Sequence, residues 1–157
     1  MIQENSPMPS GELSQLKDGS MVTHNTDELF ANKKVVLFAV PGAFTPTCSV
    51  SHLPGYVVSA DELKAKGVDA IICLSVNDAF VMNAWGEAQN AENIMMLADG
   101  NGSFTTALGL QMETAGFGGL RSQRYAMIID NGTVTSLHVE KPQEFEVSSA
   151  EAILKAL

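Results

Sequence analysis

The fold is organised around one stretch, Pro41-Gly42-Ala43-Phe44-Thr45-Pro46-Thr47-Cys48. The apolar run Val35–Val40 before it predicts a buried strand, and Ser49–Leu53 after it predicts the opening of a helix. Cys48 therefore lies at a strand-to-helix junction, where free backbone N–H groups and the helix dipole favour a negative charge. Because the thiolate is the nucleophilic form of cysteine, this position predicts a reactive sulfur.

The two cysteines have different surroundings. A buried structural thiol is the usual state of a free cysteine. Pro46 and Thr47 make the flank of Cys48 a turn, which favours the reactive interpretation. Cys73 lies in the apolar run Ile71–Leu74 and is predicted to be a core thiol. The alternative for Cys73 is a resolving cysteine that forms a disulfide with Cys48.

Length and composition predict one globular domain, residues 1–157, with 45% hydrophobic residues for its core. The net charge is −9, with only nine Lys and Arg residues. This balance argues against nucleic acid and against anionic membrane surfaces as partners. No apolar run reaches the ~20 residues that a membrane span requires.

The N-terminus, Met1–Asn5, has neither the basic start nor the apolar segment of a signal peptide. Two cysteines do not make a disulfide framework. We therefore expect a reducing compartment, most simply the bacterial cytoplasm. The alternative is an organellar form whose transit peptide has been removed.

Periodicity and turn signals predict an alternating order of strands and helices. The predicted strands are 13–16, 21–23, 34–40, 68–76, 94–97, 124–129 and 133–139, with Asn131-Gly132 as a hairpin turn. The predicted helices are 27–30, 49–66 with a break at Pro54-Gly55, 79–89, 103–108 and one at the C-terminus. The expected caps are Thr26, Asn77 or Asp78, Ser103, and a capping box over Ser148–Glu151, and residues 114–120 are expected to be a loop.

Alternation in the first part of the chain and a hairpin near its end predict an α/β fold. Its central mixed β-sheet carries helices on both faces, which is the thioredoxin-like arrangement.

Several motifs resemble one family. Pro41, Thr45 and Cys48 fill the Pro-x-x-x-Thr-x-x-Cys pattern of peroxiredoxins. The sequence around this pattern resembles the peroxiredoxin 5 subfamily, in particular its single-cysteine, glutathione-reduced bacterial members. The resemblance extends over nearly the whole chain and includes the segments 52–56, 74–78 and 121–127.

The resemblance implies roles for four site residues. Cys48 is the peroxidatic cysteine, and the Thr45 hydroxyl bonds its thiolate and positions the peroxide. Pro41 shields the thiolate from bulk water. Arg124 is the catalytic arginine, a permanent cation that holds the thiolate and polarises the O–O bond. Arg121 is expected to have a lesser, structural part.

His52 follows Cys48 by one helical turn, a spacing that places two side chains on the same helix face. A hydrolytic Cys–His dyad would need direct contact between them and a third group that orients the imidazole. We expect His52 to pack beside the pocket instead.

The predicted function is a thiol peroxidase that reduces hydrogen peroxide and small alkyl hydroperoxides. Cys48 becomes a sulfenic acid, which glutathione reduces with the help of glutaredoxin. The resemblance implies no metal or organic cofactor, and a homodimer that associates through loop 114–120. A thioredoxin-like dithiol exchanger is disfavoured because Thr45 occupies the first cysteine position of a Cys-x-x-Cys motif. The alternatives are a non-enzymatic holdase or partner-binding module, and a two-cysteine, thioredoxin-dependent peroxidase that uses Cys73.

Overall fold

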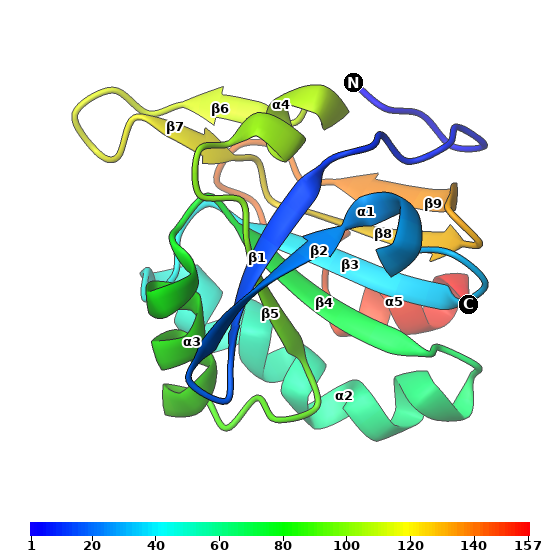
Figure 1. Cartoon of the computed structure of the whole chain (residues 1–157). Helices are drawn as coiled ribbons and strands as arrows, with labels where there is room; N and C mark the ends of the chain where they lie inside the picture. Colours follow the sequence, from blue (N-terminus) through cyan, green and yellow to red (C-terminus); the bar gives the residue numbers. More distant parts are fainter.

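A seven-stranded sheet forms the centre of the protein (Figure 1), and the computed structural model describes all residues, 1–157. Its strands are β1 (Glu12–Lys17), β2 (Ser20–Asn25), β3 (Lys34–Val40), β4 (Ala70–Ser75), β5 (Met95–Ala98), β8 (Tyr125–Asp130) and β9 (Thr133–Val139). Their spatial order is β2-β1-β5-β4-β3-β8-β9. β3, β4 and β5 are parallel and the other pairings are antiparallel, so the sheet is mixed, as predicted.

Helices cover both faces of this sheet, as predicted for a thioredoxin-like fold. They are α1 (Thr26–Leu29), the π-helix η1 (Cys48–His52), α2 (Leu53–Ala65), α3 (Ala79–Ala88), α4 (Ser103–Leu108) and α5 (Ala150–Ala156). α2, α3 and α5 pack with η1 into one hydrophobic cluster, while α1 and α4 pack into a second cluster on the opposite face. No helix has the length and apolarity that a membrane crossing requires.

The continuous apolar sequence of β3 follows from burial on both sides. Val36, Phe38 and Val40 enter the cluster beneath α2, and Val35 and Leu37 enter the opposite one. All five side chains are fully buried. A strand covered on both faces needs apolar residues at every position, and this is why its bounds are readable from the sequence.

A small hairpin of β6 (Gln111–Glu113) and β7 (Leu120–Ser122) projects beyond the main sheet. The predicted loop 114–120 is therefore shorter, because Leu120 pairs with Glu113 in this hairpin. These strands are too short and too exposed to produce an apolar pattern in the sequence.

Three predicted helix caps are wrong. The cap of α1 is Asn25, while the buried Thr26 hydroxyl donates to the carbonyl oxygen of Pro9. The Asp99 carboxylate, not Ser103, accepts the N–H groups of the first turn of α4. The cap of α5 is Ser149, one residue later than predicted, and Ala152 at the third helical position cannot complete a capping box. The predicted cap at Asp78 of α3 is confirmed.

Candidate active site

Cys48 is the first residue of η1, immediately after the loop that follows β3. Its carbonyl oxygen accepts from the N–H of Leu53, five residues later, as in a π-helix. The predicted break in this helix is therefore a change from π to α geometry, and Pro54 lies in the first turn of α2, where proline is commonly found. The Cys48 side chain is only 1% exposed, so the sulfur lies below the protein surface.

Arg124 reaches the Cys48 sulfur across 76 residues of sequence, and its Nη2 donates to Sγ over 3.1 Å. β3 and β8 pair Ala39 with Tyr125, which places the residue before β8 beside the end of β3. The expected pairing of Cys48 with this arginine is present in the structure. A thiolate at Sγ therefore faces a permanent positive charge.

His52 holds the other side of the same guanidinium. Arg124 Nη1 lies 2.9 Å from His52 Nδ1, and His52 Nε2 lies 3.0 Å from the carbonyl oxygen of Ser148. Guanidinium groups only donate and carbonyl groups only accept, so Nδ1 must accept and Nε2 must carry the proton. This arrangement fixes one neutral tautomer and forms no Cys–His dyad.

The charge state of His52 agrees with this tautomer. Burial, together with the adjacent Arg124 charge, lowers the pKa of His52 from 6.5 to about 3. The hydrogen bond to Ser148 and the nearby Glu140 charge act in the opposite direction but are weaker. At neutral pH His52 is therefore a neutral acceptor for Arg124.

The hydrogen bonds of His52 are part of a network that extends into the loop between β9 and α5. Tyr56 Oη also donates to the Ser148 carbonyl oxygen, over 2.8 Å. Glu140 Oε2 accepts from Ser148 N and Ser148 Oγ, at 2.9 and 2.7 Å, and from Glu146 N at 2.7 Å. Glu140 N in turn donates to the carbonyl oxygen of Arg124. The hydrogen bonds thus form a closed ring that starts and ends at Arg124.

Thr45 and Pro41 lie in the loop between β3 and η1, and the bonding of Thr45 differs from what the resemblance implies. Thr45 Oγ1 donates to the carbonyl oxygen of Gly42 over 2.6 Å rather than to the Cys48 sulfur. The hydroxyl oxygen keeps its lone pairs, so it can still accept a hydrogen bond from a bound molecule. Pro41 lines the pocket described next.

A pocket of about 650 Å³ opens beside Arg124. It is lined mainly by polar side chains: Pro41, Thr47, Gln111, Met112, Thr114, Phe117, Arg121, Gln123, Arg124, Glu140, Lys141, Pro142, Gln143 and Glu144. Arg121 donates to the carbonyl oxygens of Gly118 and Val76, in keeping with its expected structural part. The pocket gives a small solute access to the residues around the sulfur. No three His, Cys, Asp or Glu side chains are grouped to hold a metal ion.

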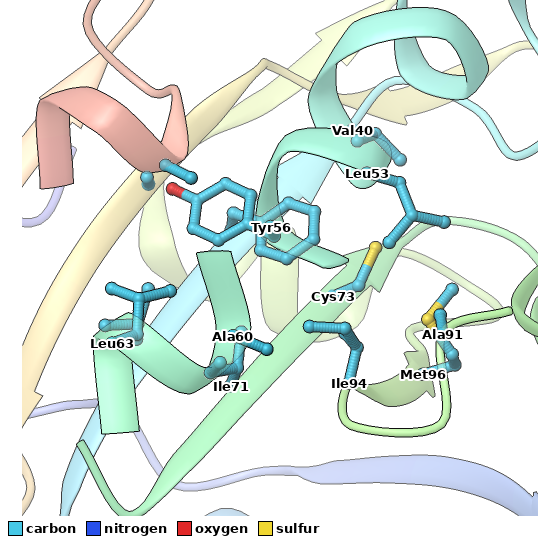
Figure 2. Close-up of a cluster of buried hydrophobic side chains, with 14 of the residues drawn as sticks. Val40, Leu53, Tyr56, Ala60, Leu63, Ile71, Cys73, Ala91, Ile94 and Met96 are labelled. Carbon is cyan, nitrogen blue, oxygen red and sulfur yellow. The ribbon is translucent and has the colours of Figure 1, made fainter. Parts of the chain in front are cut away.

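Cys73 lies in the core on β4, as predicted. Figure 2 shows its sulfur among Leu53, Tyr56 and Ile94. Burial raises the pKa of the Cys73 thiol well above its usual value, and the nearby Cys48 charge acts in the same direction. Both cysteines are free thiols in the structure. Cys73 is therefore a protonated core residue and a poor nucleophile.

The sequence did not indicate Glu140, Ser148 or the bonding role of His52. Glu140 is a charged residue at the end of a strand, and such residues are usually exposed. Its side chain is only 7% exposed because it turns inward to the 146–148 backbone. No periodicity or spacing rule reports such a contact, since it depends on the path of the loop.

Known proteins share both the sequence and the overall fold of this chain. The chain is 50% identical over 153 residues to Peroxiredoxin-2D of Arabidopsis thaliana, which covers 96% of this chain and 94% of that protein. It is 51% identical over 138 residues to the hybrid peroxiredoxin hyPrx5 of Haemophilus influenzae, with 84% of this chain and 56% of that protein covered. Reduced Prx3 of Vibrio vulnificus, in complex with hydrogen peroxide, superimposes with a TM-score of 0.98 at 71% identity over 99% of both chains.

The Redoxin family model matches residues 3–154, nearly the whole chain. The matched range includes the loop that carries Cys48 and the β8 segment that brings Arg124 to it. Because this family model covers nearly the whole chain and a peroxiredoxin at 50% identity covers 96% of it, the chain belongs to the Redoxin family and is a peroxiredoxin, a thiol peroxidase.

Proposed function

We propose that this peroxiredoxin reduces hydrogen peroxide and small alkyl hydroperoxides and is recycled by glutathione, with glutaredoxin accelerating the cycle. The observation that carries the proposal is the 3.1 Å contact between Arg124 Nη2 and Cys48 Sγ, with Arg124 and Thr47 lining an open pocket beside it. The contact supports thiolate chemistry at Cys48, and the pocket supports access by small peroxides and small thiols. Hydrogen peroxide bound to the Prx3 of Vibrio vulnificus supports the same substrate class.

In the oxidative step, the Cys48 thiolate attacks the nearer peroxide oxygen and an S–O bond forms. The O–O bond breaks, and its electron pair leaves on the other oxygen, which takes up a proton as water or alcohol. Cys48 is oxidised to the sulfenic acid and the peroxide is reduced. Arg124, the Thr45 hydroxyl and the backbone N–H of Cys48 align the two oxygens and stabilise the charge on the leaving one.

In the reductive steps, the sulfur of one glutathione attacks the sulfenic acid sulfur, and water leaves as a mixed disulfide forms. A second thiol, from glutathione or glutaredoxin, attacks the glutathione sulfur and releases the Cys48 thiolate. With glutathione as both thiols, the cycle consumes one peroxide and yields glutathione disulfide, water and the alcohol or a second water.

The charges of the pocket support an anionic thiol. Three cations, Arg121, Arg124 and Lys141, line it beside two carboxylates, Glu140 and Glu144, whereas the chain as a whole has nine cations and a net charge of −9. None of these cations pairs with a carboxylate, since the one such pair of the protein joins Lys155 to Glu151, and Glu140 is engaged by the 146–148 turn. Glutathione carries two carboxylates, which unpaired cations attract.

The assembly and location are part of the same proposal. Loop 114–119 exposes Phe117, whose side chain is 69% accessible, and an aromatic surface residue of this kind supports a homodimer contact. The bacterial cytoplasm, with its reduced thiol pool, would supply the reductant.

Peroxide consumption with each reductant offered separately tests the proposal. Reduced protein should consume peroxide with glutathione plus glutaredoxin, and Cys48→Ser should not. If thioredoxin with its reductase supports faster turnover than glutathione plus glutaredoxin, the reductant assignment is wrong. If Cys48→Ser consumes peroxide as fast as the parent, the chemistry at Cys48 is wrong.

A further inference from the structure

The hydrogen-bond ring around Arg124 contains one charged residue that does not touch the sulfur. Glu140 Oε2 accepts three hydrogen bonds, two from Ser148 and one from the backbone of Glu146. Burial opposes the ionised form of this carboxyl, but these bonds outweigh burial, and the pKa of Glu140 is lowered. Glu140 is therefore an ionised anchor of the 146–148 turn at neutral pH.

The turn that Glu140 anchors carries the acceptor for His52. The Ser148 carbonyl oxygen accepts hydrogen bonds from both His52 Nε2 and Tyr56 Oη, and all three residues are buried. If this carbonyl moves away, His52 loses the acceptor that holds the proton on Nε2. The proton can then occupy Nδ1, which converts that atom from an acceptor into a donor facing the Arg124 guanidinium.

The orientation of the guanidinium depends on that acceptor. Nη1 donates to His52 Nδ1 and Nη2 donates to Cys48 Sγ, so one planar group is held at two of its corners. The remaining contact is the Phe145 ring, 6.0 Å from the guanidinium carbon, in the same loop that Glu140 holds. Loss of the Nδ1 bond would leave Arg124 free to rotate away from the sulfur.

We propose that Glu140 is a positioning residue: by fixing the Ser148 carbonyl it selects the His52 tautomer that directs Arg124 Nη2 at the Cys48 sulfur. This proposal rests on the proposed peroxide chemistry only where its test measures a reaction rate. The tautomer of His52 is a second readout that does not require any reaction at Cys48.

The test compares Glu140→Ala and Glu140→Gln with the parent, using the full-length reduced protein and hydrogen peroxide. Glutamine keeps the length and one carbonyl oxygen, so it should retain more of the rate than alanine. Displacement of a catalytic group by about 1 Å can cost about 10²-fold, so alanine should slow sulfenic acid formation by up to that factor. Glu62→Ala, which removes a carboxylate from the exposed face of α2, is the matched control for loss of charge.

Two readouts separate positioning from a general structural role. Nitrogen-15 NMR of the histidine side chains should show His52 protonated at Nε2 in the parent and a larger Nδ1-protonated population in Glu140→Ala. In an Arg124→Ala background, Glu140→Ala should change the peroxide rate by less than twofold, because Glu140 acts only through Arg124. If the parent fails to react with peroxide, the proposed function is contradicted, but the His52 tautomer can still be measured. Three results would overturn the proposal for Glu140: an unchanged His52 tautomer in Glu140→Ala, peroxide rates of both Glu140 variants within twofold of the parent, or an equally large decrease in rate when Glu140→Ala is added to Arg124→Ala.

Discussion

Arg124 Nη2 lies 3.1 Å from Cys48 Sγ, although the two residues are 76 positions apart in the chain. The sheet register creates this contact, because Tyr125 on β8 pairs with Ala39 near the end of β3. The antiparallel pairing of β8 with β3 therefore brings the guanidinium to the loop that carries the thiol.

Replacement of Arg124 by alanine should leave the fold intact and slow the reaction with hydrogen peroxide by ~10²–10³-fold, since one preorganised charge contact is lost. Arg124→Lys should recover little of this loss, because an ammonium cannot hold His52 Nδ1 and Cys48 Sγ with the planar fork of a guanidinium. Stopped-flow measurement of the second-order rate constant checks both variants. If Arg124→Ala reacts with hydrogen peroxide as fast as the parent, Arg124 takes no part in the reaction.

His52 should make the folded state sensitive to acid. Its folded pKa is about 3 and its ordinary value is 6.5, so the unfolded chain binds the proton first as the pH falls. The stability that comes from neutral His52 is complete above about pH 6.5 and is lost as the pH falls from there towards 3. His52→Asn should flatten the dependence of the free energy of unfolding on pH between about 6.5 and 4.5, above the range in which Glu140 titrates. Urea denaturation of the parent and the variant at several pH values in this window measures the effect, and identical slopes would contradict it.

The sequence was sufficient for those parts of the fold that have a simple pattern. β3 is apolar at every position because both faces are covered, and Asn131-Gly132 has the positive φ angles that its hairpin turn requires. The predicted bounds of β3, Lys34–Val40, agree with the structure. The cap of α5 was displaced by one residue because Ser148 and Ser149 have equal capping ability. Only the structure shows that Ser148 is committed to Glu140.

The candidate site was predictable only in part. Cys48, Thr45 and Pro41 form a local motif, whereas the ring joins three segments distant in sequence, those of His52, of Arg124 and of the loop with Glu140 and Ser148. Its formation depends on the path of the 140–149 loop, which carries no periodic signal. The Thr45 hydroxyl was expected to bond the thiolate, but the carbonyl oxygen of Gly42 is its acceptor in the structure.

The unpaired cations of the pocket should discriminate between thiol reductants by charge. Lys141→Glu should raise the KM for glutathione by about fivefold, since an exposed charge pair contributes up to ~1 kcal/mol. For cysteamine, which is cationic and has no carboxylate, the same change should lower the KM or leave it constant. Steady-state turnover with each thiol measures this, and Lys64→Ala on the exposed side of α2 is the control for loss of a cation. Equal shifts of KM for both thiols would exclude a carboxylate contact at Lys141.

The proposed homodimer should depend on Phe117. Burial of a phenylalanine side chain contributes roughly 1.5–3 kcal/mol, so Phe117→Glu should weaken self-association by at least tenfold. Sedimentation equilibrium at micromolar concentration should show a dimer for the parent and a larger monomer fraction for the variant. Val58→Glu on α2, at an 85% exposed position, is the matched control. If the parent is a monomer, the proposed dimer is wrong. If Phe117→Glu leaves the dimer unchanged, the interface lies elsewhere on the protein.

Cys73 decides between the one-cysteine cycle and the two-cysteine alternative. Its thiol is fully buried on β4, burial raises its pKa, and Cys48 packs into the same hydrophobic cluster. A disulfide needs Cα atoms about 4.4–6.8 Å apart and side chains that face each other, and removal of Cys73 from a central strand would disrupt the ladder to β3 and β5.

Cys73→Ala leaves a small apolar cavity and no unpaired polar group, so we expect a modest loss of stability and normal turnover with glutathione and glutaredoxin. After one equivalent of peroxide without thiol, mass spectrometry should find oxidised Cys48 and no Cys48–Cys73 bridge. A bridge in good yield, or loss of turnover in a folded Cys73→Ala protein, would establish the two-cysteine cycle instead.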